Sequence, residues 1–400
     1  MTVTRDQVLQ AFLAFSPGPV KDVRIFFAPG RVNLMGEHLD YNGGHVLPAA
    51  IDVGTWCAVR LRGDGRWRLQ SRTEAAVVEA TMADLRPADP ARGFANYPLG
   101  VIAALDDAGL TVPGADCYFW GTVLQGAGLS SSASLEVVTG YALTQMAGIS
   151  LDRIALAQIA QRAENEYVGV PCGLMDQLTV ALGRRDHALL LDIQAVTAER
   201  VPVATRGEWT LVIVDSRKPH HLVTSPYRQR REECAAALAI LQSHGWPIQH
   251  LAAISSADLS RALRVIGDPV LQRRVRHVVR EEERTRQAAD VLARGDFAAF
   301  GALMKASHES LRTDYEVTGP ELDTLAEAAW SAPGCAGSRM TGAGFGGSTI
   351  AWVAREAVKE FQEWVRAQYV ARFGYDPGFL VATLADGVHE VVEHREAEES

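Results

Sequence analysis

The stretch GRVNLMGEHLDYNGG, between Gly30 and Gly44, restricts most strongly how this chain can fold. It places an arginine, a glutamate, a histidine, an aspartate and a tyrosine within a short segment that is punctuated by glycines. Apolar segments, RVNLMG and GGHVLPAAI, flank the charges on both sides. Charges that are framed by buried chain usually line a cleft. The alternative is a solvated surface loop, in which the same charges would carry no function.

The composition is that of an ordinary globular protein. The chain has 400 residues, of which 48% are hydrophobic and 22% charged, and this length suggests two or three domains. The formal net charge of −9 argues against nucleic acid or an anionic membrane as the main partner, because phosphate groups attract an excess of lysine and arginine. No apolar run approaches the roughly 20 residues that span a bilayer. The five scattered cysteines fit neither a zinc site nor a disulfide framework, so we expect a reduced, cytoplasmic location.

Hydrophobic patterning predicts helices and strands in which the strands come in runs. Residues 54–71, GTWCAVRLRGDGRWRLQS, predict a hairpin around the Gly-Asp-Gly turn. An amphipathic helix is predicted within residues 150–169, and a shorter helix from Asp176 to Gly183. Runs of strands favour an α+β fold over a doubly wound parallel sheet. We expect a domain boundary near residue 200, which would divide the chain into residues 1–200 and 201–400.

A second glycine-rich segment, QGAGLSSSASLEVV at residues 125–138, leads into a predicted helix. Its glycines let the backbone approach a ligand, and its three consecutive serines can cap the helix. The free N–H groups and the positive dipole end of such a helix suit a phosphate group. An ordinary turn with a serine cap is the structural alternative. The segment is not a Walker P-loop, because it contains no lysine.

A third segment, TGAGFGG at residues 341–347, matches the G-x-G-x-x-G string but not its context. A dinucleotide-binding fingerprint needs a strand before it and a helix after it, whereas STIAWV predicts a strand after this segment. We therefore reject a Rossmann site. The segment is either a tight turn or a backbone wall beside a phosphate or a sugar.

Together, the three segments resemble the motifs of the GHMP small-molecule kinases, and within them those of the galactokinases. APGRVNLMGEHLDYNGG, GAGLSSSASLEV and SRMTGAGFGGS occur in the family order, and ENEYVGVPCGLMDQL and SPYRQRREEC are further galactokinase-like blocks between them. The resemblance extends from about Phe26 to Val353. It implies an α+β fold with an N-terminal domain of the ribosomal-protein-S5-like type, a C-terminal α+β domain and the active site between them.

The resemblance also implies an activity and a set of site residues. It implies transfer of the γ-phosphoryl group of ATP to the anomeric hydroxyl of galactose with Mg²⁺, by a cytoplasmic protein, expected as a monomer, that binds neither nucleic acid nor membrane. By motif position, Arg31 and Asp176 are the catalytic residues, and Ser132 and Glu164 are the magnesium ligands. The implied sugar contacts are Glu37, His38, Leu39, Asp40, Gly173, Asp176 and Tyr227. The implied nucleotide contacts are Gly126, Ala127, Gly128, Leu129, Ser130, Ser131, Ser132 and Ser71.

These implied roles agree with the chemistry of the side chains. A site that hydrogen-bonds a hydroxyl rejects an analogue that presents it elsewhere, so Glu37, His38 and Asp40 can select the axial C4 hydroxyl of galactose. Phosphoryl transfer depends on positioning and charge neutralisation, for which Arg31 and an oxygen-ligated Mg²⁺ are suited. Because a loose transition state needs little early proton removal, Asp176 is expected to orient the hydroxyl and to accept its proton late.

Departures from the galactokinase pattern leave the preferred sugar open. Leu39 stands where threonine is usual, and Pro226 and Arg228 flank Tyr227 in place of glutamate and asparagine. Because the neighbours of Leu39 are expected to point at the sugar, its own side chain is expected to pack away from it. The alternatives are a kinase for a related sugar, N-acetylgalactosamine or arabinose, and a non-catalytic sensor of galactose and ATP.

Overall fold

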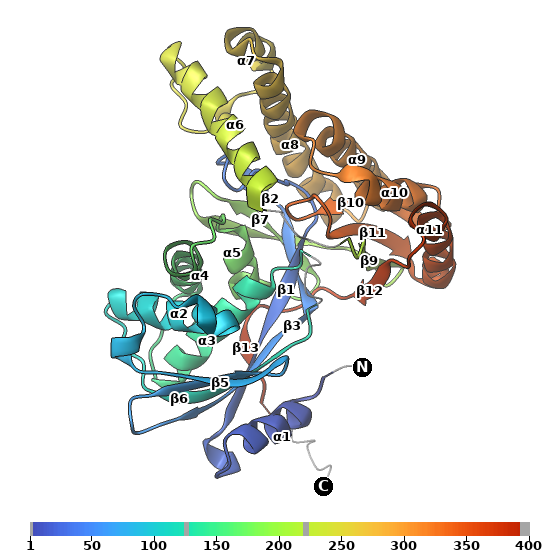
Figure 1. Cartoon of the computed structure of the whole chain (residues 1–400). Coiled ribbons are helices and arrows are strands. Elements are labelled where there is room, and N and C mark those ends of the chain that lie inside the picture. Colours follow the sequence, from blue (N-terminus) through green and yellow to red (C-terminus); the bar gives the residue numbers. More distant parts are fainter. Residues whose placement is uncertain (1–2, 124–127, 219–223, 393–400) are drawn as a thin grey trace.

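The computed structural model describes residues 3–123, 128–218 and 224–392. Within them, strands form sheets of six, four and three strands, and helices pack on the sheets (Figure 1). The α-helices are α1 Arg5–Phe15, α2 Asn96–Asp107, α3 Ser131–Met146, α4 Arg153–Arg162, α5 Met175–Leu182, α6 Thr224–Ser243, α7 Leu259–Ile266, α8 Pro269–Ala293, α9 Phe297–Ser310, α10 Gly319–Trp330 and α11 Val358–Phe373.

Strands and short helical turns complete the described structure. The strands are β1 Arg24–Asn33, β2 His45–Val46, β3 Pro48–Leu61, β4 Trp67–Ser71, β5 Glu74–Ala80, β6 Ala115–Gly121, β7 His187–Asp192, β8 Thr197–Pro202, β9 Trp209–Asp215, β10 Cys335–Thr341, β11 Ser348–Ala354, β12 Gly378–Ala382 and β13 His389–Glu390. The short turns are η1 Val20–Asp22, η2 Met82–Asp84, η3 Pro90–Ala95, η4 Ala163–Val168, η5 Leu251–Ala253, η6 Leu311–Tyr315 and η7 Arg355–Ala357.

The six-stranded sheet belongs mainly to the first half of the chain and has the order β13-β1-β3-β6-β4-β5. Successive side chains of a strand point to opposite faces, and both faces of this sheet are covered. On one face Phe26, Cys57 and Phe119 join the core that includes α2 and α3. On the other face Ile25 and Tyr118 pack with α1. The sheet is therefore the middle layer of this half.

The predicted hairpin at residues 54–71 is wrong. β3 and β4 are not neighbours, because β6 lies between them, antiparallel to β3 and parallel to β4. β4 pairs with β5 in its own antiparallel ladder. The buried, apolar β6 needs a partner on each edge to satisfy its backbone groups, and a turn motif carries no information about such pairing. The Gly-Asp-Gly turn marks a reversal of the chain but not the partner strand.

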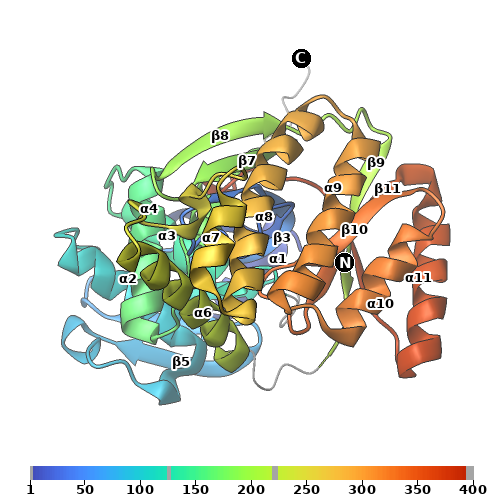
Figure 2. The same cartoon turned by 90° about the horizontal axis from the view of Figure 1, so that it is seen from above.

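The four-stranded sheet, in the order β10-β11-β9-β12, is the middle layer of the second half. Leu211 and Ile213 of β9 pack on the side of α9, and Val212 and Val214 pack on the side of α10 and α11. Figure 2 shows these three helices grouped around the sheet, away from α2, α3 and α4. The TGAGFGG segment joins β10 to β11, so a strand follows it as predicted.

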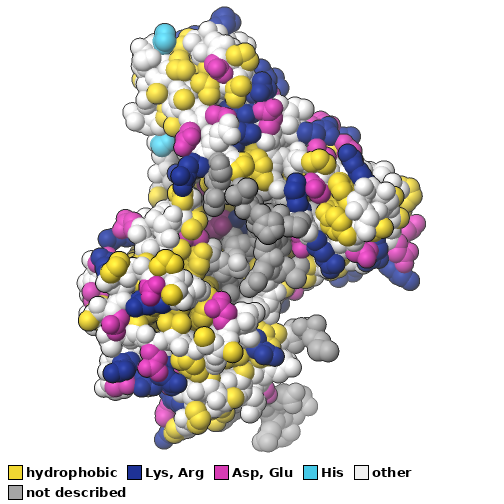
Figure 3. All heavy atoms as spheres, viewed as in Figure 1, with side chains coloured by type: hydrophobic (Ala, Val, Ile, Leu, Met, Phe, Trp, Pro, Cys, Tyr) yellow, Lys and Arg dark blue, Asp and Glu magenta, His cyan; other side chains and the backbone are white. Residues whose placement is uncertain are grey.

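The end of the chain returns to the first sheet. β13 pairs antiparallel with β1, where Phe26 lies opposite Glu390. The domain boundary near residue 200 stays a proposal. The strand β13, although it comes from the end of the sequence, belongs to the sheet of the first half. No helix of the described residues is long and apolar enough to cross a membrane. On the face seen in Figure 3, side chains of both charges are intermixed.

Gly301 is a point of close approach between α9 and β10. A Cβ atom on Gly301 would lie 1.7 Å from the carbonyl oxygen of Ala336, so the helix would have to move. We expect Gly301→Ala to lower the free energy of unfolding, measured in urea, by about 1–3 kcal/mol, because overpacking outweighs a helix-propensity gain of about 1 kcal/mol. Gly63→Ala is the control, because nothing lies within 4 Å of a Cβ there. Equal stability of the two variants would contradict this account.

Candidate active site

A cavity of about 380 Å³ collects polar side chains from distant parts of the chain. Its walls come from residues of the segments 31–40, 169–176 and 227–228 and from Gly342 and Ala343. The predicted site residues that line it are Arg31, Glu37, His38, Asp40, Gly173, Asp176 and Tyr227. The third glycine segment thus forms part of the wall of this cavity.

The segment after β1 turns sharply, and this turn aims its polar groups into the cavity. Gly36 has a φ of 96°, and a Cβ there would lie 2.7 Å from the carbonyl oxygen of His45. His38 has a φ of 64°, a left-handed conformation that is strained for a residue with a Cβ and that clusters at functional sites. Gly173 is equally constrained, because a Cβ there would lie 1.8 Å from Asp40 Oδ2.

Arg31 and Asp176 form a two-pronged ion pair at one side of the cavity. Arg31 Nε and Nη2 each lie 2.8 Å from a different carboxylate oxygen of Asp176. Arg31 Nη1 donates to the Gly128 carbonyl at 2.6 Å, and the Ser130 hydroxyl donates to Asp176 Oδ2. Asp176 lies in the first turn of α5, which begins at Met175 and is followed by Gly183, close to the prediction. The pair therefore joins the cavity to the start of α3.

Glu37 is buried at the junction of the two halves. Asn33 Nδ2 donates to one of its carboxylate oxygens at 2.8 Å, and Gly342 N donates to the other at 2.8 Å. Arg339 Nη2 lies 3.5 Å from Glu37 Oε1. Burial raises the pKa of Glu37, while the charge of Arg339 and the two hydrogen bonds oppose the shift. A single side chain thus depends on groups from both ends of the sequence.

The pKa values of His38 and Asp40 shift in opposite directions for the same main reason. Burial lowers the pKa of His38 to about 3, and nearby positive groups, His277 first, add to the shift. Burial raises the pKa of Asp40 to about 6, with further contributions from the negative charges of Asp176 and Glu37. Removal from water disfavours the charged form of either group. The cavity thus holds a neutral imidazole beside clustered carboxyl groups.

The predicted magnesium ligands are in contact, with Ser132 in the first turn of α3 and Glu164 in η4. Burial raises the pKa of Glu164, and a hydrogen bond from the Ser132 hydroxyl lowers it. Among the described residues no three histidine, cysteine, aspartate or glutamate side chains form a metal-binding group. A hydroxyl and a carboxylate still fit Mg²⁺, which keeps several waters or phosphate oxygens among its ligands.

Three residues of this region, Glu136, Gln177 and Cys172, escaped the sequence reasoning. Glu136 is fully buried in α3, and Gln177 Nε2 donates to Glu136 Oε2 at 3.2 Å and to Glu164 Oε2 at 2.7 Å. Burial and the nearby Glu164 raise the pKa of Glu136 well above its usual range. Cys172 Sγ lies 3.3 Å from Glu164 Oε2. The sequence signal that could have indicated these residues is Glu136 itself, a glutamate within the otherwise uncharged segment SSASLEVV.

The predicted phosphate-binding loop is described in part. Gly126 and Ala127 lie outside the described residues. Leu129 is buried, and its carbonyl accepts a hydrogen bond from Arg31 N at 3.2 Å. Ser131 is the first residue of α3 and is exposed. The expected serine cap is wrong for Ser130, which has a left-handed backbone and whose hydroxyl binds the Asp176 carboxylate instead of a backbone N–H group.

Two residues assigned to the site lie outside the cavity. Leu39 is fully buried in the hydrophobic core, so its side chain packs as expected from its neighbours and does not line the cavity. Ser71 ends β4, where its hydroxyl contacts Thr73 Oγ1 at 3.0 Å. It lines a separate depression that also includes Trp120. A nucleotide contact at Ser71 stays a prediction.

Family models match three parts of the chain. The galactokinase galactose-binding signature matches residues 8–61, the GHMP kinases N terminal domain matches residues 96–184, and the GHMP kinases C terminal domain matches residues 288–371. The chain is 47% identical to a galactokinase of Halalkalibacterium halodurans, over 96% of this chain and 98% of the relative. It is 45% identical to a galactokinase of Exiguobacterium sibiricum, over 92% and 93%.

Solved structures show the same relationship. The crystal structure of Lactococcus lactis galactokinase complexed with galactose matches with a TM-score of 0.92 and 39% identity, covering 97% of this chain and 100% of that one. The Methanococcus jannaschii mevalonate kinase matches with a TM-score of 0.68 at 17% identity, covering 92% and 100%, and shares the fold alone. The expected α+β architecture with two GHMP kinase domains is confirmed.

The raised pKa of Asp40 predicts that this residue lowers stability at neutral pH. Between its usual pKa near 3.8 and the folded value of about 6, the folded state holds a proton that the unfolded state has lost, so stability falls as the pH rises. Asp40→Asn removes this loss. The unfolding free energy of Asp40→Asn should exceed that of wild type by an amount that grows between pH 4 and 6. Above pH 6 this difference should level off at about 1–3 kcal/mol.

Urea unfolding of wild type and Asp40→Asn at several pH values between 4 and 8 measures this gain. Asp290→Asn, which changes an exposed aspartate of α8, is the matched control and should show no comparable rise. A gain that is independent of pH would contradict the cause given for the Asp40 shift.

Proposed function

Because the chain belongs to the galactokinase family of the GHMP kinases, we propose that it transfers the γ-phosphoryl group of ATP to the anomeric hydroxyl of galactose. The observation that carries this proposal is the ion pair of Arg31 and Asp176, which stands between the polar cavity and the start of α3. An acceptor hydroxyl in the cavity and a phosphate at the helix start would meet at this pair. Positioning of this kind supplies most of the catalysis in phosphoryl transfer.

The cavity suits a sugar held by several hydroxyl groups. Glu37, Asp40 and Asp176 offer carboxylate oxygens from three directions, and His38 and Tyr227 add groups with a different hydrogen-bonding character. A volume of about 380 Å³ has room for a monosaccharide and bound water. Pre-positioned polar groups penalise a sugar whose C4 hydroxyl has the other configuration, because buried polar groups are then left unpaired.

The start of α3 supports the nucleotide and magnesium proposals. A helix leaves its first N–H groups without a partner inside the helix, so those of α3 suit phosphate oxygens, and Ser131 is exposed there. Ser132 and Glu164 would hold Mg²⁺, with the phosphates and water as its other ligands. When bound, the ion would neutralise charge on the transferring phosphoryl group. We also propose a cytoplasmic location, which the five free cysteines favour, and a monomeric state.

Asp176 would orient the acceptor hydroxyl and take its proton. Each carboxylate oxygen already accepts a hydrogen bond from Arg31, so the direction of the group is fixed before the sugar arrives. A lone pair that faces the cavity remains for the sugar hydroxyl. Arg31, next to it, would stabilise the negative charge of the transferring group.

Turnover with a panel of sugars tests the proposed substrate. Galactose, N-acetylgalactosamine, arabinose and glucose are each supplied with ATP and Mg²⁺, and ADP release is measured. We expect turnover of galactose and little turnover of glucose. If galactose is inactive and another sugar reacts, the substrate is wrong but the kinase assignment stands. No ADP from any sugar would favour the sensor.

Asp176→Asn should lower kcat by at least about 100-fold with the fold intact, because the hydroxyl then loses both its proton acceptor and a fixed charge. Thermal unfolding checks that the variant folds, and Asp290→Asn serves as the matched control for loss of one negative charge. Near-wild-type turnover in a folded Asp176→Asn protein would show that Asp176 has no part in the chemistry.

Leu39→Thr restores the usual galactokinase residue and separates packing from specificity. Since Leu39 is fully buried in the core, we expect a loss of about 2–4 kcal/mol in unfolding free energy. The ratio of kcat/KM between galactose and the other sugars of the panel should stay unchanged. A changed ratio in the folded variant would make Leu39 a specificity residue after all.

A further inference from the structure

His38 is connected to a chain of side-chain groups behind the cavity that the proposed reaction does not use. His38 Nδ1 lies 2.9 Å from Tyr41 Oη, and Tyr41 Oη lies 2.9 Å from Tyr315 Oη. Tyr315 Oη lies 3.2 Å from Cys234 Sγ. We propose that this chain fixes the His38 tautomer that carries its proton on Nε2, and that Nε2 donates a hydrogen bond to an oxygen of the bound sugar.

This inference deepens the function proposed above and rests on it for the identity of the ligand. It assigns Tyr41, Tyr315 and Cys234 as positioning residues, since they act through His38 and lie behind it. Tyr41 belongs to the sugar-binding motif, but Tyr315 and Cys234 come from the second half of the sequence, so the motif alone does not predict the connection between them.

All members of the chain keep their protons, so only the direction of the hydrogen bonds is open. Burial lowers the pKa of His38 to about 3, which leaves the imidazole neutral, with one nitrogen as donor and the other as acceptor. Burial also raises the pKa of both Tyr41 and Tyr315 well above the usual range. A neutral imidazole thus faces two neutral phenols and a thiol, and the Asn42 side chain hydrogen-bonds both Tyr315 and Cys234.

The relative strengths of the acceptors favour one direction. An imidazole nitrogen is more basic than a phenol oxygen, and a thiol sulfur is only a weak acceptor. In one direction, the Cys234 thiol donates to Tyr315, and Tyr315 donates to Tyr41. Tyr41 then donates its O–H to His38 Nδ1, which is the strongest acceptor of the series. The reverse chain would end on the sulfur. With Nδ1 as the acceptor, the imidazole proton must lie on Nε2.

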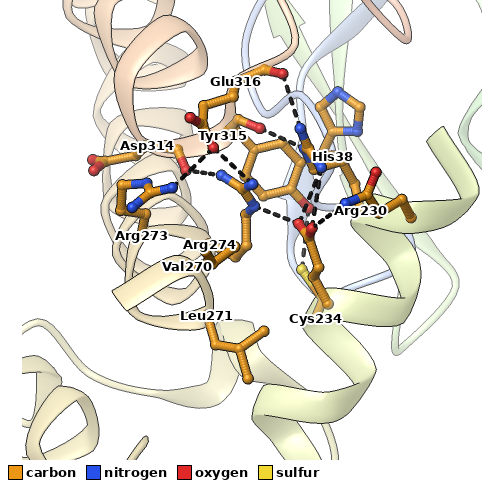
Figure 4. A network of polar contacts seen from close by, with 12 residues as sticks. His38, Arg230, Cys234, Val270, Leu271, Arg273, Arg274, Asp314, Tyr315 and Glu316 are labelled. Carbon is orange, nitrogen blue, oxygen red and sulfur yellow. Dashed lines mark hydrogen bonds and ion pairs between the residues drawn. The ribbon is translucent and has the colours of Figure 1, made fainter. Parts of the chain in front are cut away.

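Hydrogen bonds hold Tyr315 in place, so the hydrogen-bond chain from Cys234 to His38 is formed before a ligand binds. Arg230 Nε donates to the Tyr315 carbonyl at 2.7 Å, and Arg274 Nη1 donates to the Asp314 carbonyl at 2.6 Å. Arg274 Nε in turn lies 2.6 Å from Glu233 Oε2. Figure 4 shows side chains of α6 and α8 converging on Tyr315, with His38 beyond it. Arginine side chains of α6 and α8 thus hold the backbone at Tyr315, and Tyr315 contacts Tyr41.

A hydrogen-bond donor at the position of His38 would complement the carboxylate acceptors that line the cavity. Nε2 is buried and has no hydrogen-bond partner among the described residues, while His38 lines the cavity. The ionised carboxylates of Glu37, Asp40 and Asp176 accept hydrogen bonds only, and three of the five N–H groups of Arg31 are bound within the protein, so His38 Nε2 and the Tyr227 hydroxyl are the main donors left for a sugar. A sugar hydroxyl that gives its proton to a carboxylate has lone pairs left, and Nε2–H would satisfy one of them.

NMR of the full chain, with nitrogen-15 in its histidine rings, tests the tautomer directly. Proton–nitrogen spectra distinguish the protonated from the unprotonated ring nitrogen, and the His38 signals are those missing from His38→Gln. We expect the proton on Nε2 in the wild-type protein without sugar. A proton on Nδ1 would overturn the inference. This result does not depend on turnover, so failure of the kinase proposal would appear separately, as absence of ADP release.

Kinetics of Tyr41→Phe test the consequence for the sugar. Loss of the hydroxyl should mix the two His38 tautomers and raise KM for galactose about five- to tenfold, the effect of one hydrogen bond, with kcat within about twofold. Tyr315→Phe, which removes the middle hydroxyl, should act in the same direction. Tyr375→Phe is the matched control, because it removes a hydroxyl that lies 3.1 Å from Tyr369 Oη, outside the cavity. An unchanged tautomer and KM in a folded Tyr41→Phe protein would also overturn the inference.

Discussion

The buried carboxylate of Glu37 is the interaction on which the site depends. Removing a carboxylate from water costs several kcal/mol unless charges and hydrogen bonds replace the lost hydration. Asn33, four residues earlier, supplies one hydrogen bond, and Gly342 and Arg339 supply the rest from more than 300 residues away. The polar turn is therefore stable only when the strands of both halves are in place. Formation of the cavity is in this way coupled to the docking of the two halves.

The buried carboxyl groups of the cavity lower the stability of the fold, and residues next to the cavity offset part of this loss. Burial raises the pKa of Asp40, and the negative charges of Asp176 and Glu37 add to the shift, so ionising this carboxyl group costs stability. Arg31 offsets part of it by binding both oxygens of Asp176. The backbone must also come close, so Gly173 leaves room for Asp40 where any side chain would collide. Strain of this kind is typical of sites that are preorganised for a ligand.

Sequence reasoning succeeded where the information was local. The strand after TGAGFGG, the short helix that begins near Asp176 and the buried Leu39 follow from periodicity, glycine placement and the alternation of neighbouring side chains. It failed where pairing was non-local. β6 separated two strands that a turn motif had joined, and Ser130 turned from the helix end to a carboxylate of another helix. Both errors come from partners that are distant in the sequence.

The sequence by itself determined the family, the order of the three motifs and the types of side chain at the cavity, because these are properties of contiguous residues. The tertiary structure alone decided how they act together. Arg31 and Asp176 are 145 residues apart, and only the fold makes them an ion pair. The chain from His38 through Tyr41 to Tyr315 spans 274 residues between its two tyrosines, and no periodicity reveals it. Hydrogen bonds depend on distance and direction in space, and a linear pattern records neither.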